Sequence, residues 1–251
     1  MTSHHLIAAT RMGFRDQFRH PLLIALVLIL PFFFITRAIA ATHPIPKLIT
    51  LPGGNEYLTD MRDIHGASMA AITVAFVAGL CGAFIMRSSR NIDRRLVVAG
   101  FRPAEAIAPR LLVLAAATVV IVAVSIAVTA LSFNPESWIW FVVGNLLIGA
   151  TYACIGAIAG AALGDLGATY MVLFAAMLGI GVLQNPMFGA GEPNGAALLF
   201  PDWAAGRIII DACFGRGFQA WPEFGLALVW MTVLGTTVTV VVRRSLGVRT
   251  P

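Results

Sequence analysis

Six apolar stretches, each about as long as a bilayer is thick, limit what this chain can fold into. A membrane-spanning helix needs roughly 20 mostly apolar residues, and hydrophobic residues make up 59% of the chain. A charge at the centre of such a helix costs about 2.5–3.5 kcal/mol, and almost none falls there. The pattern predicts an all-α integral membrane protein with one membrane domain and six spans, at residues 21–39, 68–86, 106–131, 138–163, 169–187 and 224–242.

Basic residues are divided unevenly between the two sets of loops. If the N-terminus lies in the cytoplasm, only five of the 17 Lys and Arg residues face outside, namely Arg37, Lys47, Arg62, Arg207 and Arg216. The positive-inside rule then predicts that both termini are cytoplasmic, in a multi-pass protein of the cell (cytoplasmic) membrane. The formal charge of +5 therefore reports topology and gives no reason to expect nucleic-acid binding.

The start of the chain permits a second interpretation. A basic segment, the apolar run at residues 22–35 and the sequence Ala38-Ile39-Ala40 also resemble a signal peptide with its cleavage site. Cleavage would leave five spans and the same cytoplasmic C-terminus. We favour a retained first span because the leading segment of about twenty residues is long for a signal peptide and is regularly patterned.

Residues 1–20 are expected to form a cytoplasmic amphipathic helix that lies on the inner membrane face. Phe14 and Phe18 share one arc of a helical wheel, and Arg11, Arg15 and Arg19 follow at four-residue spacing on the next arc. Such a helix rests its apolar side in the headgroup region and attracts anionic lipid with its basic side. The alternative is an ordinary basic flank that serves topology alone.

The loops of the remaining domain, residues 21–251, differ in character. The outer loop at 40–67 is expected to be irregular, with a short polar helix near residues 57–64. In the inner loop at 87–105, residues 90–99 can form a short helix that Gly100 ends, and Pro103 suits the start of the next helix.

Small residues repeat at four-residue spacing in the fourth span. Gly156, Gly160 and Gly164 form a small-xxx-small face, which permits close helix contact. We expect this face to pack within one subunit, with dimerisation as the alternative.

The outer segment at 188–223 is too apolar for a solvated loop and is broken by proline and glycine. Short helices that enter the outer leaflet and pack against spans five and six would explain both properties. They are expected to help close the exit of a pathway, through an outer gate made of Leu198, Leu199, Phe200, Ile208, Ile209 and Ile210.

Sequence signatures of several reactions are missing from the chain. It has no G-x-x-x-x-G-K-[ST] phosphate loop, no H-E-x-x-H, no cysteine pairs for a metal and no G-x-S-x-G. No Asp, Glu or Lys lies in the middle of a span, which disfavours a proton-coupled carrier. We therefore expect no catalytic residue, metal or cofactor in this chain, and expect any energy for transport to come from a partner at the cytoplasmic face.

The inner loop carries a resemblance to a known family. The run from Ile92 to Ile107 has a charged start, an apolar helix, a proline and a return into the third span. Together with six spans, both ends inside and a long apolar outer segment, this run resembles the ABC-2 type exporter permeases. That family often has a glutamate-rich start here, whereas this chain has one Asp and several Arg.

The resemblance implies a coupling helix between spans two and three, seated on a separate ABC ATPase that binds ATP and Mg. The functional unit would contain two permeases, identical or paralogous, and two ATPases, and would export a hydrophobic drug-like or lipid-like substrate. The main coupling residues would be Ile92, Asp93, Arg94, Arg95, Leu96, Val97, Val98, Ala99 and Gly100, and the minor ones Gly164, Asp165, Leu166 and Gly167.

Other classes of function stay open. A secondary transporter or channel should show a polar or charged path in mid-membrane. A haem-export or cytochrome-maturation subunit would share the architecture, and a membrane scaffold would transport nothing.

Overall fold

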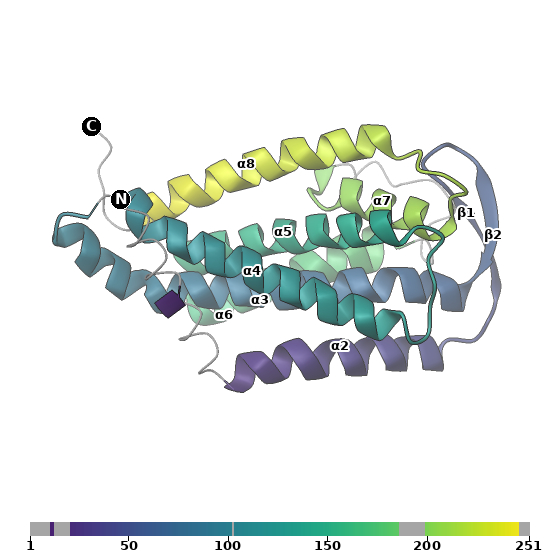
Figure 1. The fold of residues 1–251 in the computed structure, drawn as a ribbon, viewed down its shortest axis with the longest axis horizontal. Coiled ribbons are helices and arrows are strands. Elements are labelled where there is room, and N and C mark those ends of the chain that lie inside the picture. The colour runs from purple at the N-terminus through teal and green to yellow at the C-terminus, as the bar shows by residue number, and fades with distance from the viewer. Residues whose placement is uncertain (1–10, 13–20, 102, 186–198, 246–251) are drawn as a thin grey trace.

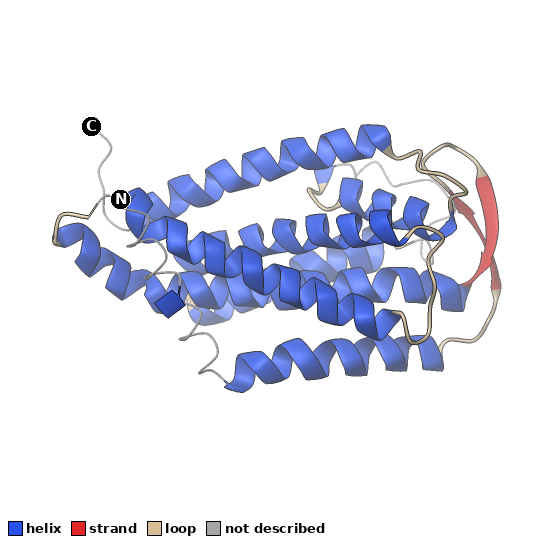
Figure 2. Ribbon diagram, viewed as in Figure 1, coloured by secondary structure: helices blue, strands red, loops and turns tan. Residues whose placement is uncertain are grey.

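A computed structural model describes residues 11–12, 21–101, 103–185 and 199–245. It is a bundle of long helices with one β-hairpin at one end (Figures 1 and 2). The helices are α2 (Pro21–Ala41), α3 (Met61–Val98), α4 (Pro103–Thr129), α5 (Trp138–Ala162), α6 (Asp165–Ala176), the π-helical segment η1 (Met177–Leu183), α7 (Trp203–Phe214) and α8 (Trp221–Ser245). The strands are β1 (Pro46–Thr50) and β2 (Glu56–Asp60), which pair antiparallel.

Six of these helices are long and apolar enough to cross a membrane, with α6 and η1 together forming one of the six. They coincide with the six predicted spans, so the chain is a multi-pass α-helical membrane protein. The side chains that they expose are apolar: Phe32, Phe33 and Phe34 of α2 are all more than half exposed. Such a surface suits contact with lipid and would be costly in water.

The bundle has two distinct ends. We call the end where α2 begins and α8 ends the terminal end; it also holds the α3–α4 and α5–α6 connections (Figure 1). The opposite end, with β1 and β2, is the hairpin end. It also holds the α4–α5 and α7–α8 connections.

The two central helices, α3 and α5, make the most extensive contact in the bundle. A Cβ atom at Gly156 would overlap the carbonyl of Gly79, and one at Gly160 would overlap that of Ala83. Gly156 and Gly160 thus let the two backbones approach closely within one subunit. Gly164 does not take part as expected: it is exposed, and a Cβ there would meet no atom within 4 Å. It precedes α6, beyond the end of α5.

The expectation of an irregular first loop with a polar helix near residues 57–64 is wrong. Tyr57 pairs with Ile49 and Leu58 with Leu48 in the hairpin, and Gly54, with φ 79°, forms its turn. The helix begins only at Met61, because the Asp60 carboxylate accepts hydrogen bonds from the first free N–H groups of α3.

Residues 90–98 are helical as expected, but they belong to α3 and do not form the short helix of their own that was expected over residues 90–99. α3 runs without a break from Met61 to Val98, well past the end of its membrane-spanning part at Arg90. Gly100, with φ 95°, ends the helical run as predicted, and α4 begins at Pro103. The inner loop is therefore an extension of a span and not an independent element.

Candidate functional site

The extension of α3 carries exposed apolar side chains at the terminal end. Ile92 and Val98 expose 53% and 87% of their surface, and Phe101, just after the helix, exposes 48%. We call these three residues the apolar tip. Arg94 and Arg95 are exposed beside them. The tip lies beyond Arg90, where the part of α3 that is apolar enough to span a membrane ends. An exposed apolar surface outside lipid is typical of a protein-binding site.

The other expected coupling residues are distributed unevenly. Leu96 and Val97 are half-buried, and Val97 packs against the bundle core. Ala99 and Gly100 are exposed. The apolar tip, and not Leu96 or Val97, therefore offers the surface that a partner can reach.

Polar contacts fix the extension to its neighbours. Arg87 of α3 forms an ion pair with Asp165, the first residue of α6, and donates a hydrogen bond to the carbonyl oxygen of Leu163 at 3.0 Å. On the other side, Arg110 of α4 donates to a carboxylate oxygen of Asp93 at 3.4 Å. The main and the minor coupling segments named above are thus joined through α3. Gly164, Leu166 and Gly167 of the minor segment are exposed, Leu166 over 72% of its surface.

Asp93 is unusual in this group because its side chain is buried, with 3% exposed. Burial raises the pKa of its carboxyl above the ordinary value, and this effect outweighs the opposing attraction and hydrogen bond of Arg110. A buried carboxylate needs its cation. The Asp93–Arg110 pair therefore ties the position of the extension to α4.

Of the expected interface-helix residues, Arg11 is described and is exposed. Phe14, Arg15, Phe18 and Arg19 lie outside the described residues, as does Leu198 of the expected outer gate.

α7 is a short buried helix in the hairpin half of the bundle (Figure 1). Its C-terminal end meets the α4–α5 turn, where Ser137 N–H donates to the Ala212 carbonyl at 2.8 Å. Its N-terminal end meets Tyr152, ten residues before the end of α5. At a rise of 1.5 Å per residue, Tyr152 is ~15 Å from that end of α5 and ~21 Å from the other. α7 thus spans only part of the bundle depth.

The gate residues separate into buried and exposed sets. Ile208, Ile209 and Ile210 are buried in α7, and Gly144 of α5 leaves the space that Ile209 fills. Phe200 is half-buried, whereas Leu199 exposes 78% of its surface. α7 packs mainly on α5 and α8, so its principal partner is span four and not span five as expected.

An arginine connects α7 to the hairpin. Arg207 donates to the Thr50 carbonyl of β1 at 2.8 Å, and the ring of Tyr57 lies 5.7 Å from that of Phe214. The carboxylate of Asp211 accepts from the N–H groups of Gln219 and Ala220 in the turn before α8. Hairpin, α7 and the start of α8 therefore form one connected structure.

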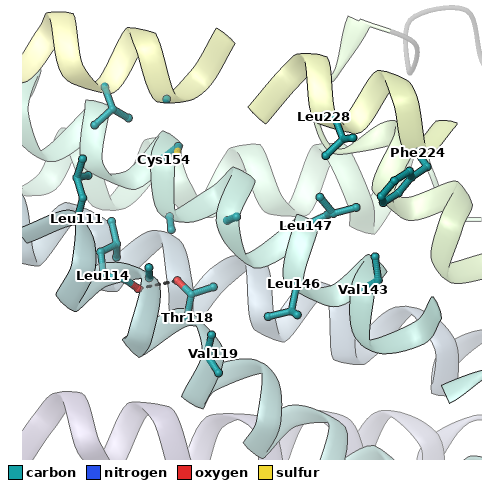
Figure 3. Close-up of a pocket in the computed structure, with 15 residues that line it drawn as sticks. Leu111, Leu114, Thr118, Val119, Val143, Leu146, Leu147, Cys154, Phe224 and Leu228 are labelled. Carbon is teal, nitrogen blue, oxygen red and sulfur yellow. Dashed lines mark hydrogen bonds between the residues drawn. The ribbon is translucent and has the colours of Figure 1, made fainter. Parts of the chain in front are cut away.

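A groove of about 570 Å³ lies between α4, α5 and α8. Leucine and valine side chains line it, with Phe224 and Leu228 of α8 facing Leu147 of α5 (Figure 3). Thr118 is its one hydroxyl group, and this hydroxyl donates to the Leu114 carbonyl of its own helix. The groove therefore offers a hydrocarbon surface with no free polar group, which suits an acyl chain or another apolar molecule.

The interior also holds a polar group that the sequence analysis missed. Asp202 lies directly before α7 but makes no capping bond to it. Its side chain instead reaches the hydroxyl of Tyr152, with Oδ2 and Oη 2.6 Å apart, and Asp202 is 1% exposed. Asp202 lies between the predicted spans, in a segment whose depth in the bundle no sequence pattern indicates. The sequence signal that could have drawn attention to Asp202 is the Pro201-Asp202 pair before an apolar run, which is typical of a helix start.

Comparisons with known proteins do not assign this chain to a family. No model of a known protein family matches the chain, and no curated protein matches it. Among the residues that the structure describes, no group of three or more His, Cys, Asp or Glu side chains could hold a metal ion.

Proposed function

We propose that this protein is the membrane-spanning permease subunit of an ABC-2 type exporter, with ATP hydrolysed by a separate subunit. The observation that carries the proposal is the apolar tip. It lies on a helix that crosses the bundle, beyond the membrane-spanning part, and is flanked by arginines. A soluble partner bound there could act on the whole length of α3.

The orientation in the proposal follows from charge. Arg90, Arg94 and Arg95 on α3 and Arg243 and Arg244 on α8 are all at the terminal end. The positive-inside rule assigns that end to the cytoplasm. The hairpin and the end of α7 then face outward. A cysteine in place of Val98 should react with a membrane-impermeant thiol reagent only after the cells are opened, and one in place of Asn55 should react in intact cells. The reverse pattern would overturn this orientation.

The groove between α4, α5 and α8 supports a hydrophobic substrate, drug-like or lipid-like. Its lining is almost wholly apolar, and it is formed by three helices that are long and apolar enough to span the membrane. By analogy with the family that the inner loop resembles, two permeases would stand together, each above one ATPase.

Reconstitution tests the proposal directly. The chain should be placed in liposomes with and without an ATP-binding subunit that co-purifies with it, and export of a fluorescent lipid or lipophilic dye followed. We expect export to require both the subunit and ATP. Val98→Asp should abolish the stimulation of export by ATP, whereas Leu58→Asp, at an exposed leucine in β2, should not. Export by the chain alone, driven by an ion gradient, would overturn the proposal.

One observation favours a second candidate, a secondary transporter. The spans lack a central Asp, Glu or Lys, but α7 brings the carboxyl of Asp202 to the middle of the bundle. Buried ionisable groups at this depth often belong to ion pathways. The liposome assay separates the two candidates, since only the second predicts gradient-driven transport without ATP.

A further inference from the structure

Three oxygen atoms lie in a row where α5, α6 and the start of α7 meet. Oδ2 of Asp202 is 2.6 Å from the hydroxyl oxygen of Tyr152, which is 2.9 Å from the carbonyl oxygen of Ala175. Both separations are those of hydrogen bonds. Each therefore needs one hydrogen atom between its two oxygens.

For both contacts to be full hydrogen bonds, two hydrogens are needed, and the groups present can supply them in only one way. A tyrosine hydroxyl carries one hydrogen, and a backbone carbonyl carries none. If Tyr152 donates to Ala175, the hydrogen between Tyr152 and Asp202 must belong to the carboxyl group. An ionised Asp202 would leave one of the two contacts with two acceptors and no donor.

The surroundings of Asp202 agree with a neutral carboxyl. Its other oxygen, Oδ1, has no hydrogen-bond partner among the described residues. Besides Tyr152, the amide of Gln184 is close enough to interact with the carboxyl, although it is outside hydrogen-bond geometry. A buried ionised carboxylate without a cation is strongly disfavoured.

Among the residues that the structure describes, no cation faces Asp202 from the elements packed around it. In α7, Arg207 is directed to the Thr50 carbonyl and Asp211 to the turn before α8. α5 contributes Tyr152, and α3 has no charged side chain between His65 and Arg87, its one thiol there being Cys81. η1 carries no titratable group, Tyr170 of α6 is exposed, and α8 has no charged side chain between Glu223 and Arg243.

We propose that Asp202 is a buried proton-binding site, occupied in this structure, which donates to Tyr152 so that Tyr152 can donate to Ala175. Loss of the proton to water would leave a carboxylate, and the Tyr152 hydroxyl would turn its hydrogen toward it. The Ala175 carbonyl would then lose this partner. Ala175 lies two residues before η1, and π-helical turns are frequent at functional sites. Proton occupancy therefore controls how α5 and α7 are attached to the α6–η1 junction.

A small cavity lies beside Gln184. It measures about 20 Å³ and is lined on its polar side by Ser68, Gln184 and Asn185, with Gly206 of α7 also in its wall. This volume is enough for one water molecule. Gln184 thus lies beside both the carboxyl and a polar space of the size of one water molecule.

Infrared spectroscopy of the full chain in lipid tests the proposal without any transport assay. At neutral pH the wild type should show the C=O band of a protonated carboxyl, which disappears only at alkaline pH. Asp202→Asn should lose this band. Asp211→Asn is the matched control: it removes a buried carboxyl on the same helix that accepts from the backbone N–H groups of Gln219 and Ala220, and the band should remain.

One further variant, Tyr152→Phe, and the unfolding temperature of Asp202→Asn separate the hydrogen-bond chain from simple burial. Tyr152→Phe should shift the band and not abolish it, because the carboxyl keeps its proton but loses its acceptor. Asp202→Asn should unfold at a temperature no lower than the wild type, since its amide can also donate to Tyr152. A wild type with no protonated-carboxyl band at neutral pH would overturn the proposal even if the variants do not fold, as would a band that survives in Asp202→Asn.

Discussion

Arg87 of α3 pairs with Asp165 at the start of α6, and the same guanidinium donates to the Leu163 carbonyl at the end of α5. One side chain thus holds the α5–α6 turn against the helix that carries the apolar tip. Both partners are partly exposed, Asp165 over 73% of its side chain. The pair is therefore suited to fixing geometry and contributes little to stability.

Breaking the Arg87–Asp165 pair should change function more than stability. In a double-mutant cycle with Arg87→Ala and Asp165→Ala, we expect a coupling energy of about 0.2–1 kcal/mol in thermal unfolding. ATP-stimulated export should fall in both single variants if the turn and α3 move together. The charge-exchanged protein, with Arg87→Asp and Asp165→Arg, should recover part of the export. Equal export in all variants would remove any role of this pair in coupling.

The contact between α3 and α5 should not tolerate a methyl group. In Gly156→Ala the new Cβ would overlap the Gly79 carbonyl, which is backbone and cannot turn aside. We expect the free energy of unfolding, measured in detergent, to fall by about 1–3 kcal/mol. Gly164→Ala is the matched control, because a Cβ there meets nothing within 4 Å. Similar stability for the two variants would contradict the contact.

The Asp93–Arg110 pair predicts a particular dependence on pH. The pKa of Asp93 is raised in the folded protein, so its contribution to stability decreases as pH rises from the unfolded pKa to the folded one. Arg110→Met removes the neighbouring cation and should raise this pKa further. The free energy of unfolding of the variant should then be lower by about 1–3 kcal/mol at pH 7. This loss should be smaller well below the unfolded pKa, where Asp93 is protonated in both proteins. Thermal unfolding across pH measures this, and a loss that does not vary with pH would contradict it.

A charge in the middle of α7 should unfold this part of the bundle. Ile209 is 2% exposed and fills the space beside Gly144. Ile209→Asp buries a carboxylate without a partner, and we expect the free energy of unfolding to fall by about 3–5 kcal/mol. Leu58→Asp, at a residue of the hairpin that is 68% exposed, should have little effect. Folded yield and hydrogen exchange across Trp203–Phe214 report the difference, and rapid exchange of this helix in the wild type would contradict its burial.

Filling the apolar groove should reduce binding of apolar molecules without damage to the fold. Ala150→Phe places a ring among the lining residues, whereas Ala123→Phe adds the same bulk to an exposed position of α4 outside the groove. We expect binding of a lipophilic dye to fall several-fold in the first variant only, as measured by fluorescence titration in detergent. Equal affinities would show that the dye binds elsewhere.

Hydropathy was sufficient to predict the six spans, because lipid requires long apolar helices and the chain provides six of them. It could not predict the hairpin, since β1 and β2 are five residues each and are stabilised by pairing and by contacts with α7. The continuity of α3 was also hidden: the charges after Met86 indicate where a membrane ends, but nothing at residues 87–98 stops a helix.

Sequence position failed as a guide to the buried carboxyl. Asp202 is followed by an apolar segment too short and too interrupted to be a span. Its depth depends on α7 folding back along α5, which is a tertiary contact with no local pattern. The cluster of Tyr152 and Asp202, fifty residues apart, exists only in the folded chain.

The unbroken course of α3 has a mechanical consequence. Its 38 residues make a rod about 57 Å long, and Gly79, at the contact with Gly156, lies at the midpoint of that rod. If α3 tilts about this contact without bending, its two ends move in opposite directions by similar distances. A displacement of Val98 would therefore move Met61, and the hairpin attached to it, by a similar distance in the opposite direction.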